Sequence, residues 1–346
     1  MKTGLFLVAL IFAAGVAVPA AAQTESELRQ QLDAQKAINE QLRRRVQELE
    51  RQLAGAPSAP ALKPLERRAA AAEEVSPRGT TAIEEALVAK GVVLIPPGSF
   101  RLAPGFTWAH SGASALRTRI DSYVASLTAD AGLPWGMAVS ANVPYVYRDT
   151  SFGSNSGLGD FSLAVSKKLT DESDFLRGMP SWVASLSYLE KNGEDPFGPI
   201  PIGSGFRALA GTLSAVKRID PVALYGNLTF AHAFASDVNA PNFLGEASFR
   251  GRIAPGNTWG YRLGASLAAT PAISFDASLS GSFSRSTDVN SVAFGAYTLP
   301  NSTTVFFNLG AGFLLARNLS LLLNAAAGAT KDSPDFIFSL SLPYRF

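Results

Sequence analysis

Residues 134–169 read PWGMAVSANVPYVYRDTSFGSNSGLGDFSLAVSKKL, and this stretch decides the fold. Its first part alternates with a period of two, so one face of an extended chain carries Trp135, Met137, Val139, Ala141, Val143, Tyr145 and Tyr147. A polar loop rich in glycine and serine follows, and alternation then resumes from Phe161. Strands of soluble domains usually end after about five or six residues. These strands run to about ten, with aromatic residues toward their ends, which is typical of a transmembrane β-strand. The stretch therefore predicts an outer-membrane β-barrel.

The bulk composition narrows the class of protein. The chain has 346 residues, enough for one large barrel and an appended segment. Beyond the extreme N-terminus no uncharged apolar run reaches the roughly 18 residues of a membrane helix, which excludes a helical membrane protein. Cysteine is absent, so disulfides, thiolate metal sites and a cysteine nucleophile are excluded. The net charge of +2 is too small to indicate a nucleic-acid partner.

Residues 1–22 have the features of a secretory signal peptide. Lys2 gives the positive start, residues 5–18 form the apolar core, and three alanines precede Gln23 as a cleavage site. The alternative is a membrane anchor, which the short apolar run and the cleavage site disfavour. We therefore expect export across the inner membrane of a Gram-negative envelope.

Residues 23–54 change to a charged helical pattern. Apolar and amide residues recur at spacings of four and three, at Leu28, Leu32, Gln35, Asn39, Leu42, Val46, Leu49 and Leu53. This spacing predicts a coiled coil of about four heptads, and a buried Asn39 would fix its register and lower the number of helices. One interpretation is a homo-oligomer held together in the periplasm. The other is a single amphipathic helix that is solvated or lies on another surface.

Residues 55–90 are predicted to form a linker rich in alanine and proline, followed by a short helix. Thr81 and Glu84 have the spacing of a capping box, and Gly91 suits the position after the last helical turn. The helix would be either a plug in the barrel lumen or a connector on the periplasmic side. The connector is the favoured interpretation.

Residues 91–346 are predicted to form the barrel, an all-β membrane fold of about twelve antiparallel strands. The predicted strands are 99–110, 115–128, 134–148, 158–169, 181–191, 205–218, 221–234, 257–269, 272–285, 303–316, 318–330 and 335–346. Short connections alternate with long ones, as in outer-membrane barrels, where the short turns are periplasmic and the long loops extracellular. Both chain termini then lie on the periplasmic side.

Alternation along the strands predicts which residues face the lumen. The lumen candidates are Arg101, Arg117, Arg119, Asp121, Arg148, Lys168, Arg262 and Asp276. The candidates for contact with membrane lipid are aromatic, among them Trp108, Trp182, Tyr188, Trp259, Tyr261, Phe275, Phe283, Phe307, Phe313, Phe338 and Tyr344. The small and serine-rich inner face predicts a narrow, weakly cationic path. Leu209, Leu213 and Leu322 also fall on the predicted inner face. They would either form an apolar stripe for hydrophobic substrates or indicate that the predicted register of these strands is wrong.

Catalytic chemistry is not indicated. The two histidines, His110 and His232, are predicted to face outward near the extracellular ends of their strands. A hydrolase triad needs a serine and an orienting group within hydrogen-bond reach of the histidine. Ser111 falls on the opposite face from His110, and alanines flank His232. We expect no enzyme activity, no catalytic residue, no metal site and no cofactor.

Three segments carry a family resemblance: GVVLIPPGSFRLAPGFTWAHS (91–111), LPWGMAVSANVPYVYR (133–148) and GLGDFSLAVSKKL (157–169). They resemble the opening strands of the meta-pathway phenol-degradation (MetA-type) outer-membrane proteins. The closing residues 343–346, PYRF, resemble the C-terminal signature by which barrels are inserted into the outer membrane. The resemblance implies passage of small compounds, aromatic or hydrophobic ones among them, across the outer membrane. The predicted coiled coil is an addition to the common family core.

Two functional hypotheses follow. In the first, the protein is an outer-membrane channel or transporter through which small-molecule solutes pass down their gradient. In the second, the barrel is a structural anchor, and the periplasmic coiled coil tethers the cell wall or a partner.

Overall fold

The computed structural model describes residues 81–112, 119–170, 179–240, 248–292 and 295–346. The predicted signal peptide, coiled coil and linker before residue 81 lie outside these residues, as does Arg117.

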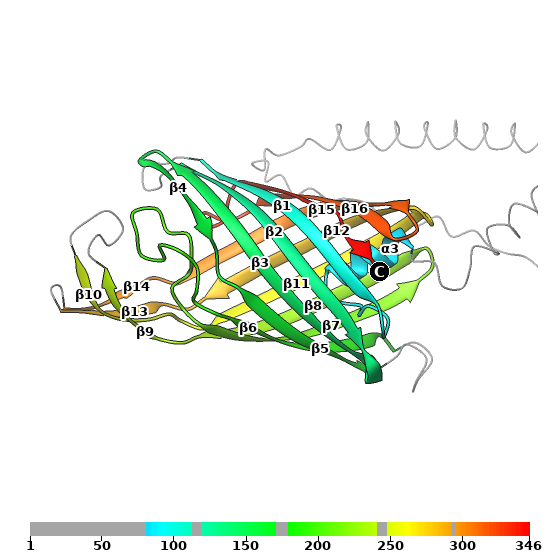
Figure 1. The fold of residues 1–346 in the computed structure, drawn as a ribbon, viewed down its shortest axis with the longest axis horizontal. Helices are drawn as coiled ribbons and strands as arrows, with labels where there is room; N and C mark the ends of the chain where they lie inside the picture. The colour runs from blue at the N-terminus through cyan, green and yellow to red at the C-terminus, as the bar shows by residue number, and fades with distance from the viewer. Residues whose placement is uncertain (1–80, 113–118, 171–178, 241–247, 293–294) are drawn as a thin grey trace, which may run out of the picture. The chain divides into compact units, whose positions relative to one another are not determined.

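The described chain forms a closed antiparallel barrel of twelve strands (Figure 1). Each strand pairs with its neighbours along the chain, and the ring closes where β17 pairs with β1. The barrel strands are β1 (Phe100–Ser111), β2 (Ile120–Leu133), β3 (Met137–Thr150), β5 (Ser162–Thr170), β6 (Ser181–Leu189), β7 (Ala208–Ile219), β8 (Val222–Ala233), β11 (Thr258–Thr270), β12 (Ile273–Ser284), β15 (Ser302–Ala316), β16 (Leu319–Gly328) and β17 (Phe336–Ser341). After β17, the short β18 (Tyr344–Arg345) pairs with β1 and β16.

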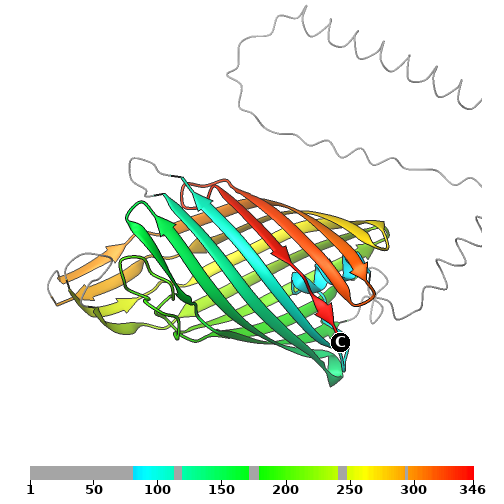
Figure 2. The ribbon, with the colours of Figure 1, turned by 45° about the horizontal axis from the view of Figure 1, so that its top comes forward.

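The two ends of the barrel differ in their connections. At one end, here called the short-turn end, two residues join β7 to β8, β11 to β12 and β15 to β16. The C-terminus and the single α-helix of the described chain, α3 (Ala82–Ala89), lie at this end (Figures 1 and 2). The opposite end, the long-loop end, carries the connections β3–β5, β6–β7, β8–β11 and β12–β15. The predicted alternation of short and long connections is therefore observed.

The strand boundaries around residues 134–148 differ from the predicted ones. Residues Pro134–Gly136 form a single 3₁₀ turn, η1, with Trp135 at φ 60° and Gly136 at φ 66°. Both residues are left-handed, which ends the extended chain. Trp135 therefore lies in a turn, 84% exposed, and β3 begins at Met137. β2 correspondingly runs to Leu133 instead of ending near residue 128.

The long loops contain further strands. β4 (Gly153–Leu158) extends the barrel wall by pairing with β3. A separate four-stranded sheet stands at the long-loop end, built from β9 (Ser236–Ala240), β10 (Phe249–Ala254), β13 (Thr287–Ser291) and β14 (Gly295–Leu299). Its core consists of Val238, Phe249, Ile253 and Val289, against which Phe197 and Phe206 of the β6–β7 connection pack. This packing fixes the β6–β7 connection to the sheet.

The outer face of the barrel is apolar. Its exposed residues include Phe106, Leu127, Val143, Leu163, Leu186, Leu228, Leu263, Leu279 and Leu309. Predicted lipid-facing aromatics such as Trp259, Phe275 and Phe307 lie on this face. Among the described residues, no helix is long and apolar enough to cross a membrane.

The inward placement of Leu209 and Leu213 is wrong. Leu209 pairs with Tyr188 of β6 and Leu213 with Leu228 of β8, and all four side chains belong to the outer face. Lys217 shares that face, but it lies near the end of β7, where a charged group reaches the polar boundary of a membrane. Leu322 does face inward, beside Asn324.

Candidate functional site: the plugged lumen

Helix α3 lies inside the barrel at the short-turn end. Its N-cap is Thr81, whose hydroxyl accepts a hydrogen bond from the Glu84 amide at 3.4 Å, as the capping box predicted. Leu87 and Val92 are buried against the inward residues Val216, Ala223 and Tyr225. The favoured connector interpretation is therefore wrong, because the apolar side of this helix packs against the inner barrel wall.

A buried cluster of ion pairs joins α3 to the first and last elements of the barrel. Arg101 of β1 and Arg345 of β18 approach the two oxygens of Glu85, at 2.9 and 2.8 Å. Arg101 also pairs with Asp130 of β2 at 2.7 Å. We call these four residues the Glu85 cluster. It has two positive and two negative groups, so the charge of the buried Glu85 is compensated.

A second polar contact lies at the end of the helix. The Lys90 ammonium is 3.2 Å from Asp276 of β12, and the same carboxylate accepts hydrogen bonds from Tyr225 at 2.6 Å and Ser266 at 3.1 Å. Lys90 also lies 5.7 Å from the centroid of the Tyr225 ring. Burial lowers the pKa of Lys90 and Asp276 opposes that shift, so the cation is held in a confined, partly desolvated position.

The chain that follows α3 is held close to β2. Gly98 donates a hydrogen bond to the Gly132 carbonyl, and Gly132 donates one to Ser99, both at 2.9 Å. A Cβ atom at Gly132 would lie 2.0 Å from the Pro96 carbonyl oxygen, so only glycine permits this approach. Residues 82–97, here called the plug segment, are thus fixed at both ends.

The plug segment forms the floor of a large cavity. The cavity measures about 860 Å³ and is bounded by Val88 to Ile95 and by inward residues of the surrounding strands. Most of the strand residues are small or hydroxylated, such as Ser140, Ser166, Ser185, Thr212, Thr229 and Ser282. A further space of about 590 Å³ lies beside the plug segment at the short-turn end, next to Lys168. The lumen is therefore roomy and lined by many hydroxyl groups, and the plug segment lies between its main cavity and the short-turn end.

The β6–β7 connection narrows the other end of the lumen. Inward-facing Arg148 donates to the Pro201 carbonyl at 2.5 Å, and Asn155 donates to that of Ile200 at 2.9 Å. Both donors belong to the inner face of the β3–β4 hairpin, so the connection lies on the lumen side of that hairpin.

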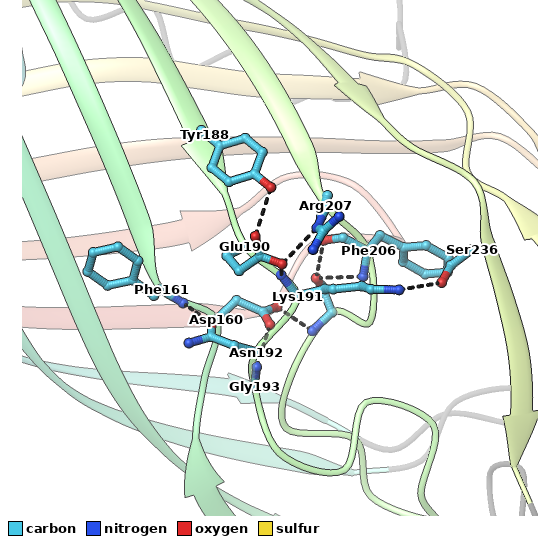
Figure 3. A network of polar contacts seen from close by, with 11 residues as sticks. Asp160, Phe161, Tyr188, Glu190, Lys191, Asn192, Gly193, Phe206, Arg207 and Ser236 are labelled. Carbon is cyan, nitrogen blue, oxygen red and sulfur yellow. Dashed lines mark hydrogen bonds and ion pairs between the residues drawn. The ribbon is translucent and has the colours of Figure 1, made fainter.

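Two carboxylates hold the base of this connection (Figure 3). Glu190 accepts hydrogen bonds from Arg207 at 2.7 Å and Tyr188 at 2.8 Å. Asp160 accepts from the backbone amides of Gly193 and Ser204. The hydrogen bond from Arg207 lowers the pKa of Glu190, with Tyr188 adding to the shift.

The structure brings some of the predicted lumen residues together and not others. Arg101 and Asp276 contact the plug segment, Arg262 faces the main cavity, and Arg148 and Lys168 lie near its two ends. Glu85, Lys90, Asp130 and Tyr225 were not predicted to face the lumen, because the sequence gives no signal that they meet.

The inward placement of Arg119 and Asp121 is wrong. Asp121 has the same parity on β2 as exposed Tyr123 and Leu127, so it lies on the outer face. There it contacts His110 and Arg119, at 2.7 Å each, and the Trp108 indole at 3.3 Å. These partners satisfy a carboxylate that would otherwise be costly on this surface. Because Tyr123 lies two positions after Asp121 on the same strand, its aromatic side chain was the sequence signal that could have placed Asp121 on the outer face.

Both histidines lie on the outer face near the long-loop end, and each has an orienting partner that sequence reasoning missed. His110 contacts Asp121, and His232 Nδ1 lies 2.7 Å from the Asn257 side-chain oxygen. Ser111 is buried on the opposite face of β1. No cluster of three or more potential metal ligands occurs among the residues described by the structure.

The fold is similar to that of a solved outer-membrane channel. The crystal structure of an outer membrane channel from Pseudomonas putida F1 matches with a TM-score of 0.61 and 14% identity, over 74% of this chain and 98% of that chain. The KdgM porin aligns at a TM-score of 0.40 and 10% identity, over 72% of this chain and 99% of that one. No protein-family model matches the chain. The comparison establishes the fold, a twelve-stranded barrel of the outer-membrane kind, and the MetA-type resemblance stays a prediction.

Proposed function

We propose that this protein is an outer-membrane channel for small solutes, with the plug segment as its gate. The observation that carries the proposal is the cavity of about 860 Å³, lined by many serine and threonine residues, inside a closed barrel whose outer surface is apolar. A barrel that serves only as an anchor gains stability from a filled interior, as in small barrels packed with side chains. A lumen lined by hydroxyl groups is suited to water and polar solutes. The similar barrel from Pseudomonas putida F1 is an outer membrane channel, which supports this proposal.

The lengths of the connections support one orientation in the membrane. Short turns of outer-membrane barrels face the periplasm and long loops face outward, so the plug segment would close the periplasmic side. The preceding residues, with the predicted coiled coil, would then lie in the periplasm and oligomerise the protein. Aromatic or hydrophobic solutes are a finer proposal, which rests on the MetA-type resemblance alone.

The plug segment is suited to move as a unit. Its contacts with the wall are ion pairs, apolar packing and a few backbone hydrogen bonds, such as that from Ala82 to Pro271 at 3.0 Å. No strand–strand pairing of the barrel involves residues 82–97. Release of the plug segment would therefore leave the hydrogen-bonded barrel intact.

Planar-bilayer conductance and liposome flux of a neutral sugar test this function. Correct folding is checked first by heat-dependent mobility on detergent gels. We expect discrete conductance steps that become larger in a variant lacking residues 82–97. A folded deletion variant with neither conductance nor sugar flux would overturn the channel proposal and leave the anchor.

A further inference from the structure

Arg262 differs from the other charged residues around the main cavity. The charged lining residues are Lys90, Arg101, Asp130 and Arg262. The first three are paired, Lys90 with Asp276 and Arg101 with both Asp130 and Glu85. Arg262 makes no hydrogen bond or ion pair within the described part of the chain, and its Nε atom is buried. Arg262 as a whole is half-buried, and a buried N–H group without a partner is costly unless something else compensates it.

The strand register shows what surrounds this guanidinium. Asn227 on β8 and Ser280 on β12 lie directly opposite Arg262 on its two sides. Phe306 on β15 lies opposite Ser280, and all four residues line the same cavity. Asn308 donates to the Ser280 hydroxyl oxygen at 3.0 Å, which orients that hydroxyl. A cation, an amide, a hydroxyl and an aromatic ring therefore form one row across the inner wall.

Two glycines leave space around Arg262. Its inward neighbours along β11 are Gly260 and Gly264. At Gly264 the Tyr225 hydroxyl would lie 2.5 Å from an added Cβ atom, so the tyrosine fills that space. At Gly260 the nearest atom would be 3.6 Å away, which is ordinary contact. β11 starts at the long-loop end, so Gly260, which has no side chain, flanks Arg262 on that side, and Tyr225 flanks it on the other.

We propose that Arg262, with Asn227, Ser280 and Phe306, binds a small organic monocarboxylate inside the lumen. The planar guanidinium matches a carboxylate with two parallel hydrogen bonds. Asn227 and Ser280 supply further donors, and the Phe306 ring gives the apolar body of the solute a contact surface. A doubly charged anion fits less well, because the other cations of the cavity, Lys90 and Arg101, are already engaged by carboxylates. The proposal deepens the proposed channel function by naming its solute class.

Isothermal titration of the purified full-length barrel in detergent with sodium benzoate tests the site. We expect Arg262→Gln to weaken benzoate binding by about ten-fold or more, the loss typical of a charged hydrogen bond. The matched control is Arg119→Gln, the same change on an exposed arginine outside the lumen, and it should bind like the wild type. Benzyl alcohol, a neutral analogue of similar shape, should bind much more weakly than benzoate.

Three results would overturn the proposal: undiminished benzoate binding by folded Arg262→Gln, equal binding of benzyl alcohol, or displacement of benzoate by chloride at equal concentration. If the Arg262→Gln variant does not fold, the variants Arg262→Lys and Ser280→Ala replace it in the same titration. The lysine variant keeps the charge without the planar fork, and both variants should bind with reduced affinity. Wild-type affinity in both would count against the site.

Liposome flux of arabinose separates this proposal from the channel function. Flux of arabinose without Arg262-dependent benzoate binding leaves the channel in place and removes the site. Benzoate binding that depends on Arg262, without arabinose flux even in the variant lacking residues 82–97, keeps the site and removes the channel.

Discussion

The Glu85 carboxylate lies 2.9 Å from the Arg101 guanidinium, and both side chains are less than a tenth exposed. Glu85 belongs to the helix in the lumen and Arg101 to the barrel wall. This pair attaches the short helix to the barrel wall, because a carboxylate buried in the lumen needs cationic partners to compensate its charge.

Glu85→Gln should loosen the plug segment while the barrel stays folded. Breaking a buried ion pair from one side costs about 3–5 kcal/mol, and here the cost falls on the plugged state. Single-channel recording should show a higher open probability or a larger conductance. Glu84→Gln is the matched control, because the neighbouring Glu84 makes no ion pair within the described residues. Equal gating in the two variants would contradict the assigned role of Glu85.

Gly132→Ala should displace the chain that follows α3. The added methyl would lie 2.0 Å from the Pro96 carbonyl oxygen, so either β2 or the plug segment must shift. Gly211→Ala is the control, since an added Cβ atom there meets nothing within 4 Å. We expect increased conductance only for Gly132→Ala. If both variants conduct alike, the close approach does not hold the plug segment.

Leu213→Arg tests the corrected face of β7. The Leu213 side chain is 42% exposed on the apolar outer face, near the middle of the strand. A charge there should destabilise the membrane-inserted barrel by about 2–4 kcal/mol. Thr212→Arg, on the inner face, should cost much less, since it loses mainly the Thr212–Thr229 hydrogen bond. Urea unfolding in lipid vesicles, followed by tryptophan fluorescence, measures both, and a reversed order would restore the inward placement of Leu213.

Acid should weaken the base of the β6–β7 connection through Glu190. The folded pKa of Glu190 lies below its ordinary value of 4.5, because Arg207 and Tyr188 bind the ionised form. Its stabilisation is therefore fully present above pH 4.5 and is lost as the pH falls through the lowered pKa. Hydrogen exchange over residues 190–207 should show less protection in Glu190→Gln than in the wild type at neutral pH. That difference in protection should vanish in acid. A difference that persists would contradict the expectation that only ionised Glu190 stabilises the connection.

The barrel could be predicted from the sequence because its determinants are local. Each strand carries its own alternation, and each turn carries its own glycine, proline or asparagine. The errors occurred in two strands whose inner face is unclear from the sequence. β7 has small residues on both faces, and β2 has the charged Asp121 near its start on the outer face.

The plug could not be predicted, because its determinants are distant in the chain. Glu85 and Leu87 suit a solvated connector helix as well as they suit the lumen. The choice depends on Arg345, which lies 260 residues from Glu85, and on Val216, Ala223 and Tyr225. The Arg262 row depends likewise on the register of four strands, which alternation alone does not give.

The position of Glu85 also sets an order of assembly. Its two arginines come from β1 and β18, elements at opposite ends of the barrel sequence that become neighbours only where the ring closes. The two arginines that bind Glu85 therefore come together only after the last strand has paired with the first. The helix α3 is nevertheless synthesised before both of these strands. Insertion of the helix is therefore expected late in assembly. Once inserted, the helix links β1 to β18 through Glu85 and so stabilises the closed barrel at the place where its ends meet.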